Sequence, residues 1–128
     1  GCPDDAWRER LRSVFGLDRV AGQLAGTLSG GWQKKLDLAL GFLKRPAYLL
    51  LDEPFSELDD ASKRRLLDFL ETFCTDDRTV LVVTHHVRRF EAIVDRLTVF
   101  DAGQVRYDGA VGPDELAHDR YLDVLGLD

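Results

Sequence analysis

The fold is decided by one short stretch, Ala47-Tyr48-Leu49-Leu50-Leu51-Asp52-Glu53-Pro54. Its apolar run has no polar alternation, which predicts a strand buried on both faces, as in a parallel sheet. A second run of this kind, Thr79-Val80-Leu81-Val82-Val83, is rich in β-branched residues and predicts a neighbouring strand. A helical pattern with Asp59 or Asp60 as N-cap lies between the two runs. Strand, helix and strand in this order predict an α/β fold.

Further elements are expected on both sides of this unit. In the helix between the strands, we expect the inner side to hold Leu66, Leu67, Leu70, Phe73 and Cys74. Apolar spacing and Gly or Pro boundaries predict helices at Asp5–Gly16, from Ser29-Gly30-Gly31 to Pro46, through Phe90, Ile93 and Val94, and at Pro113–Leu125. The turn signal Asp101-Ala102-Gly103 predicts a hairpin between residues 97–100 and 104–107.

The composition of the 128 residues is that of an ordinary globular domain. Lys and Arg number 17 and Asp and Glu 23, so the net charge is −6, which argues against a general nucleic-acid binder. No apolar run is as long as a membrane span, and the first residues do not read as a signal peptide. The two cysteines, Cys2 and Cys74, form no disulfide framework and fit a reducing cytoplasm.

Polar side chains follow both predicted strands. Asp52 and Glu53 end the first strand, and Thr84, His85 and His86 end the second. Because parallel strands place their carboxyl ends at one edge of the sheet, where ligands bind, we expect two acids and an imidazole to share that edge.

Consecutive residues of a strand point to opposite faces, so Asp52 and Glu53 are expected to have two different jobs. One carboxylate would hold Mg²⁺ and the other would handle a water molecule, although both could simply end the strand. The two histidines could be surface groups or could donate hydrogen bonds to a charged ligand. Zinc is disfavoured, because His118 is the only other imidazole.

A second candidate element is the helix start at Ser29-Gly30-Gly31. Backbone N–H groups, a hydroxyl and the positive end of the helix dipole form an arrangement that binds phosphate. Ser and Gly also open helices that bind no ligand, and the default reading of Trp32 is packing.

Four pieces in chain order are similar to the nucleotide-binding subunit of ATP-binding-cassette (ABC) transporters. They resemble its signature motif, Walker B motif, D-loop and switch histidine, and stand here as Leu28-Ser29-Gly30-Gly31, Leu49-Leu50-Leu51-Asp52-Glu53-Pro54, Ser56-Glu57-Leu58-Asp59 and Val83-Thr84-His85. The resemblance runs from about Leu11 to Gly109. It implies the C-terminal part of a P-loop NTPase fold, with a parallel sheet flanked by helices and a C-terminal hairpin.

The resemblance implies a role for each matched residue. Asp52 would hold Mg²⁺ through water, Glu53 would act as general base, and His85 would contact the γ-phosphate of ATP. Ser56 and Asp59 would couple two ATP sites across a dimer. The signature residues would contact the ATP of the partner subunit, and they are Ser29, Gly30, Gly31 and Gln33.

Two departures from the family pattern stand out. Trp32 occupies the position where the family usually has Gln, with Gln33 next, which predicts altered contacts rather than lost function. The chain also contains no Gly-x-x-x-x-Gly-Lys-Ser/Thr, the loop that cradles the phosphates of ATP. The family places that loop on a strand beside residues 79–83, so an unpaired apolar edge is expected here, with marginal stability or self-association.

The expected organisation has three parts: residues 1–46 with the signature helix, residues 47–110 with the sheet core and hairpin, and residues 111–128 with the last helix. The expected function is that of an ATPase subunit powering transport, unable to hydrolyse ATP alone. Its partners would be a transmembrane permease and a second ATP-binding subunit, at the inner face of the cell membrane. Alternatives are a non-transport ABC ATPase of DNA maintenance and a non-catalytic module that completes a partner's ATP site. Import or export stays open.

Overall fold

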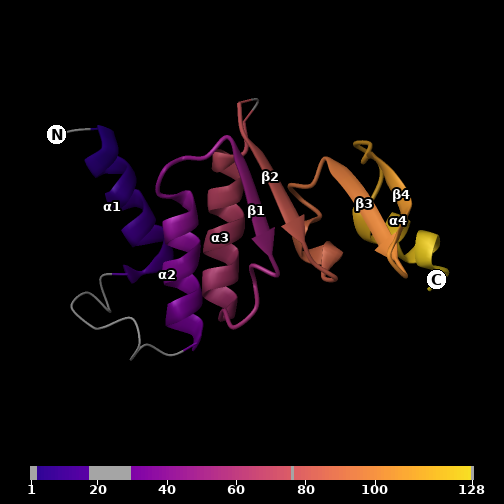
Figure 1. The fold of residues 1–128 in the computed structure, drawn as a ribbon, viewed down its shortest axis with the longest axis horizontal. Helices are drawn as coiled ribbons and strands as arrows, with labels where there is room; N and C mark the ends of the chain where they lie inside the picture. The colour runs from indigo at the N-terminus through magenta and orange to yellow at the C-terminus, as the bar shows by residue number, and fades with distance from the viewer. Residues whose placement is uncertain (1–2, 18–29, 76, 128) are drawn as a thin grey trace. The chain divides into compact units, whose positions relative to one another are not determined.

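A computed structural model describes residues 3–17, 30–75 and 77–127. They form two compact units, residues 1–84 and 85–128, and each is treated by itself. The first contains α1 (Pro3–Phe15), α2 (Gly30–Phe42), β1 (Tyr48–Asp52), α3 (Asp60–Phe73) and β2 (Thr79–Val83). The second contains η3 (Val87–Phe90), β3 (Arg96–Asp101), β4 (Gln104–Ala110) and α4 (Ala117–Leu125) (Figure 1). The predicted α/β class is confirmed.

Aromatic side chains hold helices α1, α2 and α3 of the first unit together. Phe42 of α2 is fully buried, and its ring centroid lies 4.8 Å from that of Phe69 and 4.9 Å from that of Phe73, both on α3. The ring of Phe15 in α1 stacks on the ring of Phe42, with 6.2 Å between the two centroids. The indole N–H of Trp7 donates to the carbonyl oxygen of Phe42 at 3.0 Å, and the Arg45 amide donates to the same oxygen at 3.0 Å, so both bonds satisfy the end of α2.

The strands β1 and β2 pair in parallel, as predicted, with Leu50 opposite Leu81 and Asp52 opposite Val83. The prediction that both faces of this pair are buried is wrong. The inner face is covered, and a Cβ at Gly41 of α2 would lie only 3.8 Å from Leu49 Cδ1. The outer face is open over the described residues, where the exposed fractions are Tyr48 82%, Leu50 62%, Leu81 59% and Val83 49%. We call these four side chains the open sheet face.

Helix α3 begins where the sequence predicts. Asp59 is its N-cap, and the carboxylate accepts from the Ser62 amide at 3.2 Å. Leu66, Leu70 and Phe73 are buried as expected. Leu67 is only half-buried and Cys74 is exposed, while Phe69 takes an inner position instead. The corrections follow from position: Cys74 lies beyond the last helical residue, and Phe69 shares the helix face of Phe73.

In the second unit, the hairpin of β3 and β4 is confirmed. Its two turn residues, Ala102 and Gly103, both have positive φ, at 52° and 78°, as a type I′ turn requires. The expected helix through Phe90, Ile93 and Val94 is only the short 3₁₀ turn η3, followed by turns.

The last helix, α4, is shorter than the predicted Pro113–Leu125 and begins at Ala117. Both oxygens of the Glu91 carboxylate accept from its first amides, from Ala117 N at 2.5 Å and from His118 N at 2.9 Å. Ala117 packs with Leu97 and Val99 in the core of this unit. The cap therefore comes from a residue far away in the sequence, which sets the helix start.

The predicted division at residues 46/47 and 110/111 stays a prediction about the parts of the domain.

Among the residues that the structure describes, no helix is both long enough and apolar enough to cross a bilayer.

Candidate functional site

Glu53 occupies a specially constrained position directly after β1. Its φ is +45°, a left-handed conformation that a residue with a Cβ rarely adopts. The Glu53 amide donates to the Val83 carbonyl at 2.8 Å, which ties this turn to the end of β2. Thr84 Oγ1 donates to Glu53 Oε2 at 3.1 Å, so the half-buried carboxylate is held by the neighbouring strand as well. Strain kept in place by such contacts is typical of functional positions.

Asp52 is exposed at the carboxyl end of β1, on the side of the sheet where Leu50 is exposed. A carboxylate at a strand end, open to water, is a donor that fits Mg²⁺, which binds through one or two carboxylates and keeps several waters. The two adjacent acids thus differ: one is open to solvent, and the other is held by protein hydrogen bonds.

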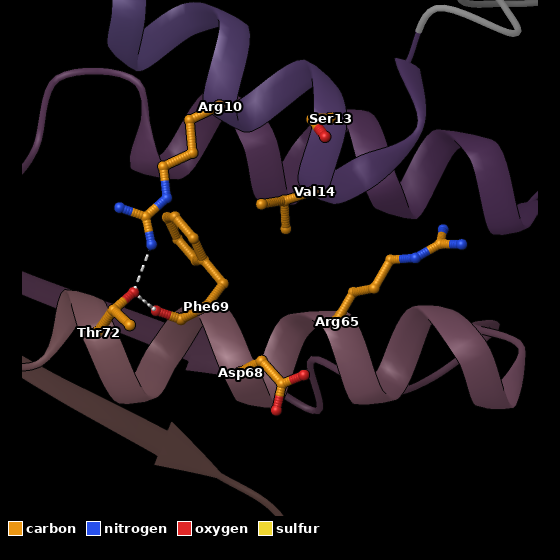
Figure 2. A pocket seen from close by; sticks show the side chains of 7 residues that line it. All are labelled: Arg10, Ser13, Val14, Arg65, Asp68, Phe69 and Thr72. Carbon is orange, nitrogen blue, oxygen red and sulfur yellow. Dashed lines mark hydrogen bonds between the residues drawn. The ribbon is translucent and has the colours of Figure 1, made fainter.

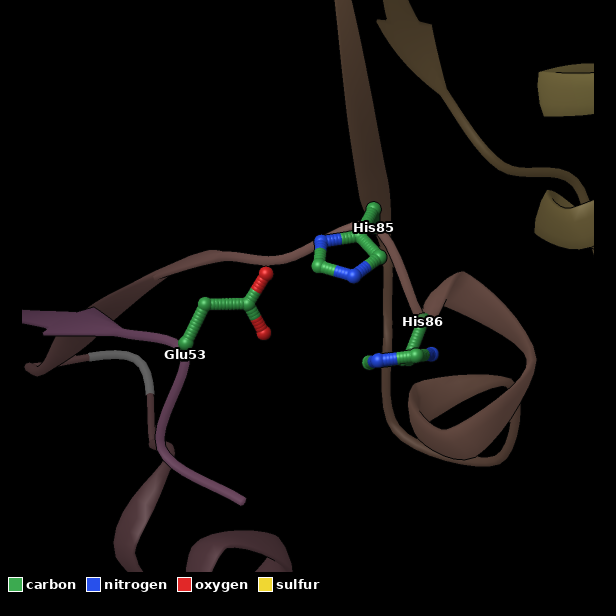
Figure 3. A group of neighbouring side chains, drawn as sticks. All are labelled: Glu53, His85 and His86. Atoms are coloured by element: carbon green, nitrogen blue, oxygen red, sulfur yellow. The ribbon is translucent and has the colours of Figure 1, made fainter. Parts of the chain in front are cut away.

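His85 and His86 follow Thr84 and belong to the second compact unit. Their ring centroids lie 4.2 Å apart. Figure 3 shows Glu53 beyond the end of β1 and both imidazoles beyond the end of β2. That His85 shares one ligand edge with the two acids stays a prediction.

The loop between β1 and α3 carries the other candidates. Ser56 is exposed, and its amide donates to the Glu53 carbonyl at 3.1 Å. Asp59 accepts from the Ser62 hydroxyl at 2.6 Å, and this hydrogen bond is the main reason why the pKa of Asp59 lies below its usual 3.8. The Ser62 amide lowers it further, and the Lys35 ammonium, 3.4 Å from Asp59 Oδ1, contributes less. Asp59 is therefore an anion fixed at the start of α3.

The candidate residues at the start of α2 are only partly described. Ser29 lies outside the described residues, and Gly30 is the first residue of the helix. A Cβ on Gly31 would lie 2.9 Å from the Glu57 carbonyl oxygen, so this position admits only glycine without a shift of the loop. Gln33 Nε2 donates to Asp37 Oδ1 at 3.4 Å along the helix.

A shallow depression of about 400 Å³ lies between α1 and α3 (Figure 2). Arg10 Nη2 donates to Thr72 Oγ1 at 2.6 Å, and Thr72 donates in turn to the Phe69 carbonyl at 2.9 Å. The Arg10 guanidinium also lies over the Phe69 ring, 5.4 Å from its centroid. These contacts hold α1 against α3, and we assign no ligand to this depression.

Sequence reasoning missed two contributors to this region. Thr84 holds Glu53, although the sequence showed it only as a strand end. Lys35 reaches Asp59 from α2, and its ammonium lies 4.0 Å from the centroid of the Trp32 ring. The three-residue spacing of Trp32 and Lys35 puts them on one helix face, which is the signal that could have found this pair.

The fold is that of an ABC-type ATPase. A solved structure titled as an ATP binding subunit of an ABC transporter superposes with a TM-score of 0.75 at 25% identity, covering 95% of this chain and 50% of that chain. A family model described as ABC transporter matches residues 3–56, a range that includes Gly31, Asp52 and Glu53.

Curated relatives agree with this match. The daunorubicin/doxorubicin resistance ATP-binding protein DrrA of Streptomyces peucetius is 34% identical over 108 residues, 82% of this chain and 33% of that protein. The aliphatic sulfonates import ATP-binding protein SsuB of Escherichia coli is 36% identical over 105 residues, 81% of this chain and 41% of that protein. The thiamine import ATP-binding protein ThiQ of Shigella flexneri is 33% identical over 108 residues, 81% of this chain and 47% of that protein.

The chain is thus similar to ABC transporter ATP-binding proteins over about four fifths of its length. It spans between 33% and 47% of the length of these three relatives.

Proposed function

We propose that this chain is the signature and Walker B part of an ATP-hydrolysing subunit that powers transport across a membrane. The observation that carries the proposal is Glu53: a carboxylate directly after β1, anchored through its backbone to Val83 and through its side chain to Thr84. The likeness to ABC transporter ATP-binding proteins suggests the reaction class, and Glu53 would supply a fixed acid where that class needs a base.

The residues at the strand ends would then divide the work. Glu53 accepts a proton from the attacking water or orients it, and Thr84 keeps the carboxylate in place. His85 donates a hydrogen bond to the γ-phosphate. Asp52 would hold Mg²⁺ through retained water, and the ion would supply positive charge that neutralises the phosphates.

The signature residues and the loop after β1 would act on a second subunit. Ser29, Gly30, Gly31 and Gln33 would contact the γ-phosphate of ATP held by that subunit, since helix N-termini bind anions. Ser56 and Asp59 would couple the two ATP sites. The subunit would thus work as a homo- or heterodimer on a transmembrane permease, at the cytoplasmic face of the membrane, without nucleic acid.

ATP hydrolysis would require a phosphate-cradling loop, because this sequence has no P-loop lysine. Titration of the chain alone with ATP and Mg²⁺, followed by Trp fluorescence, should show no saturation up to about millimolar ATP. Co-expression with the P-loop-bearing amino-terminal half of a relative should restore ATP hydrolysis. Saturable micromolar binding by the chain alone would overturn the assignment of an incomplete site.

Glu53→Gln tests the catalytic assignment in that co-expressed complex. The variant keeps the shape and the Thr84 contact and loses the basicity, so turnover should fall by about 10²–10⁴-fold while ATP binding is kept. Glu71→Gln, an exposed glutamate on α3, is the matched control and should leave turnover unchanged. Turnover of Glu53→Gln within a few-fold of the parent would refute the role.

A further inference from the structure

Trp32 stands where the family resemblance expects glutamine, and the structure gives this indole a specific set of neighbours. The Lys35 ammonium lies 4.0 Å from its ring centroid, a cation–π contact within one helix face. A Cβ placed on Gly16, the residue after α1, would lie 3.8 Å from Cη2 of the indole. The indole therefore packs against both the end of α1 and the side chain of Lys35.

Lys35 in turn reaches the loop that precedes α3. Its ammonium lies 3.4 Å from Asp59 Oδ1, and its side chain is only 13% exposed. A long flexible side chain loses much rotamer freedom when it is held in one place. The Trp32 ring reduces that freedom in advance, because it keeps the ammonium on the side of the helix that faces Asp59.

The same loop meets α2 at a second point. The Glu57 carbonyl oxygen approaches Gly31 so closely that a Cβ there would lie 2.9 Å away. Glu57 has a positive φ of 65°, so the loop takes an uncommon backbone conformation at this contact. Two contacts one turn apart on α2 thus fix the loop that ends at the α3 N-cap.

We propose that Trp32 and Lys35 form a clamp that locks the loop Ser56–Asp59 to the start of α2. Lys35 is the positioning residue, and Trp32 acts through it. The consequence for activity rests on the proposed function. Helix α2, which carries the signature residues, and the loop Ser56–Asp59 would move as one body, so ATP that contacts one of them also affects the position of the other.

Amide hydrogen exchange on the chain tests the clamp directly. In Trp32→Gln, exchange at residues 57–59 and at Ser62 should become about 3- to 10-fold faster, as expected for the loss of one partly buried cation–π contact. Trp32→Phe keeps an aromatic face, so its exchange rates should lie between those of the parent chain and those of Trp32→Gln. Lys34→Met, which removes the neighbouring charge on the same helix, should leave these rates unchanged.

The decisive arm combines two substitutions. If Trp32 acts through Lys35, then Trp32→Gln adds nothing to the exchange rates in a Lys35→Met background. Additive effects of the two substitutions, or unchanged rates in Trp32→Gln alone, would overturn the clamp. Gly31→Ala, which forces the loop away at the other contact, should raise the same rates even in variants with an intact Lys35.

The test of the clamp can fail independently of the test of the proposed function. The exchange rates report on the clamp whether or not ATP binds, whereas Glu53→Gln turnover in the complemented complex reports on the ATPase assignment. In that complex, Trp32→Gln should lower the maximal rate and leave the apparent KM for ATP unchanged, since the indole is not placed on the nucleotide of its own subunit. A changed KM with an unchanged maximal rate would contradict the coupling role.

Discussion

Replacing Leu50 and Leu81 with lysine should abolish self-association of the isolated chain. The two residues face each other in the parallel register of β1 and β2, and both are about three-fifths exposed on the open sheet face. Full burial of an aliphatic side chain is worth about 1.5–3 kcal/mol, so covering Leu50, Leu81 and Val83 would gain about 2.5–5 kcal/mol per copy. Parallel strands are normally covered on both faces, which makes this the favoured contact.

A face-to-face dimer covers two copies and gains about 5–10 kcal/mol. The loss of translational and rotational freedom costs about 4–15 kcal/mol, so at most about 6 kcal/mol remains. The expected association is therefore weak, with a dissociation constant of about tens of micromolar or higher. Sedimentation velocity over a concentration series measures it. The parent chain should show a rising weight-average coefficient, and the Leu50→Lys, Leu81→Lys variant should stay monomeric.

Leu40→Lys provides the matched control, because Leu40 is 57% exposed on α2 and not on the sheet. It should associate like the parent chain. Two results would show that the open sheet face does not drive self-association. One is a parent chain that is monomeric at every concentration, and the other is an equal loss of association in Leu40→Lys.

Three further outcomes are expected. Phe42→Ala should lower the free energy of unfolding, measured in urea, by about 3–5 kcal/mol, because this ring is fully buried among other rings. Phe100→Ala, at a 67% exposed position, should change it by less than about 0.5 kcal/mol. Equal effects of the two substitutions would contradict the described core. Arg96 holds the pKa of Asp108 below its usual 3.8, with Thr98 adding to this, so the stability that the charge contributes is present above about pH 4 and is lost as the pH falls further. Asp108→Asn should therefore flatten the acid limb of the pH–stability curve for the hairpin, and Asp123→Asn, which removes an equal charge, should not. Thr84→Val should lower turnover of the complemented complex by about 10- to 100-fold, the usual worth of a hydrogen bond to a charged group, and Thr84→Ser should restore it; a failure of serine to rescue would assign Thr84 to packing.

The parts of the fold that depend on local pattern were predictable. The strands at residues 48–52 and 79–83, an N-cap at Asp59 or Asp60 and the hairpin around Ala102 all follow from neighbouring residues. Elements set by distant partners were not. The start of α4 depends on Glu91, which is 26 residues from Ala117, and no local signal marks it. Phe90, Ile93 and Val94 have helical spacing, but only one turn forms before β3 begins.

The site shows the same division. Asp52 and Glu53 could be found from a strand followed by two acids. The hydrogen bond from Thr84 joins residues 31 apart, and the sequence could place both at one sheet edge but could not pair their side chains. The open sheet face was mispredicted because a continuous apolar run indicates burial without saying what supplies the cover.

The Glu91 cap also orders events during synthesis. A helix of nine residues does not hold in water by itself, so α4 waits for Glu91 and for the hairpin on which it packs. Glu91 and the hairpin are synthesised before α4, as this dependence requires. Leu97 and Val99 therefore emerge from the ribosome well before residues 117–125 and stay uncovered until those residues follow. A nascent chain paused there is a client for chaperones that bind apolar segments. A proteolytic cut within residues 111–116 would return the mature protein to the same condition, and would mark the whole second unit for degradation rather than nine residues of it.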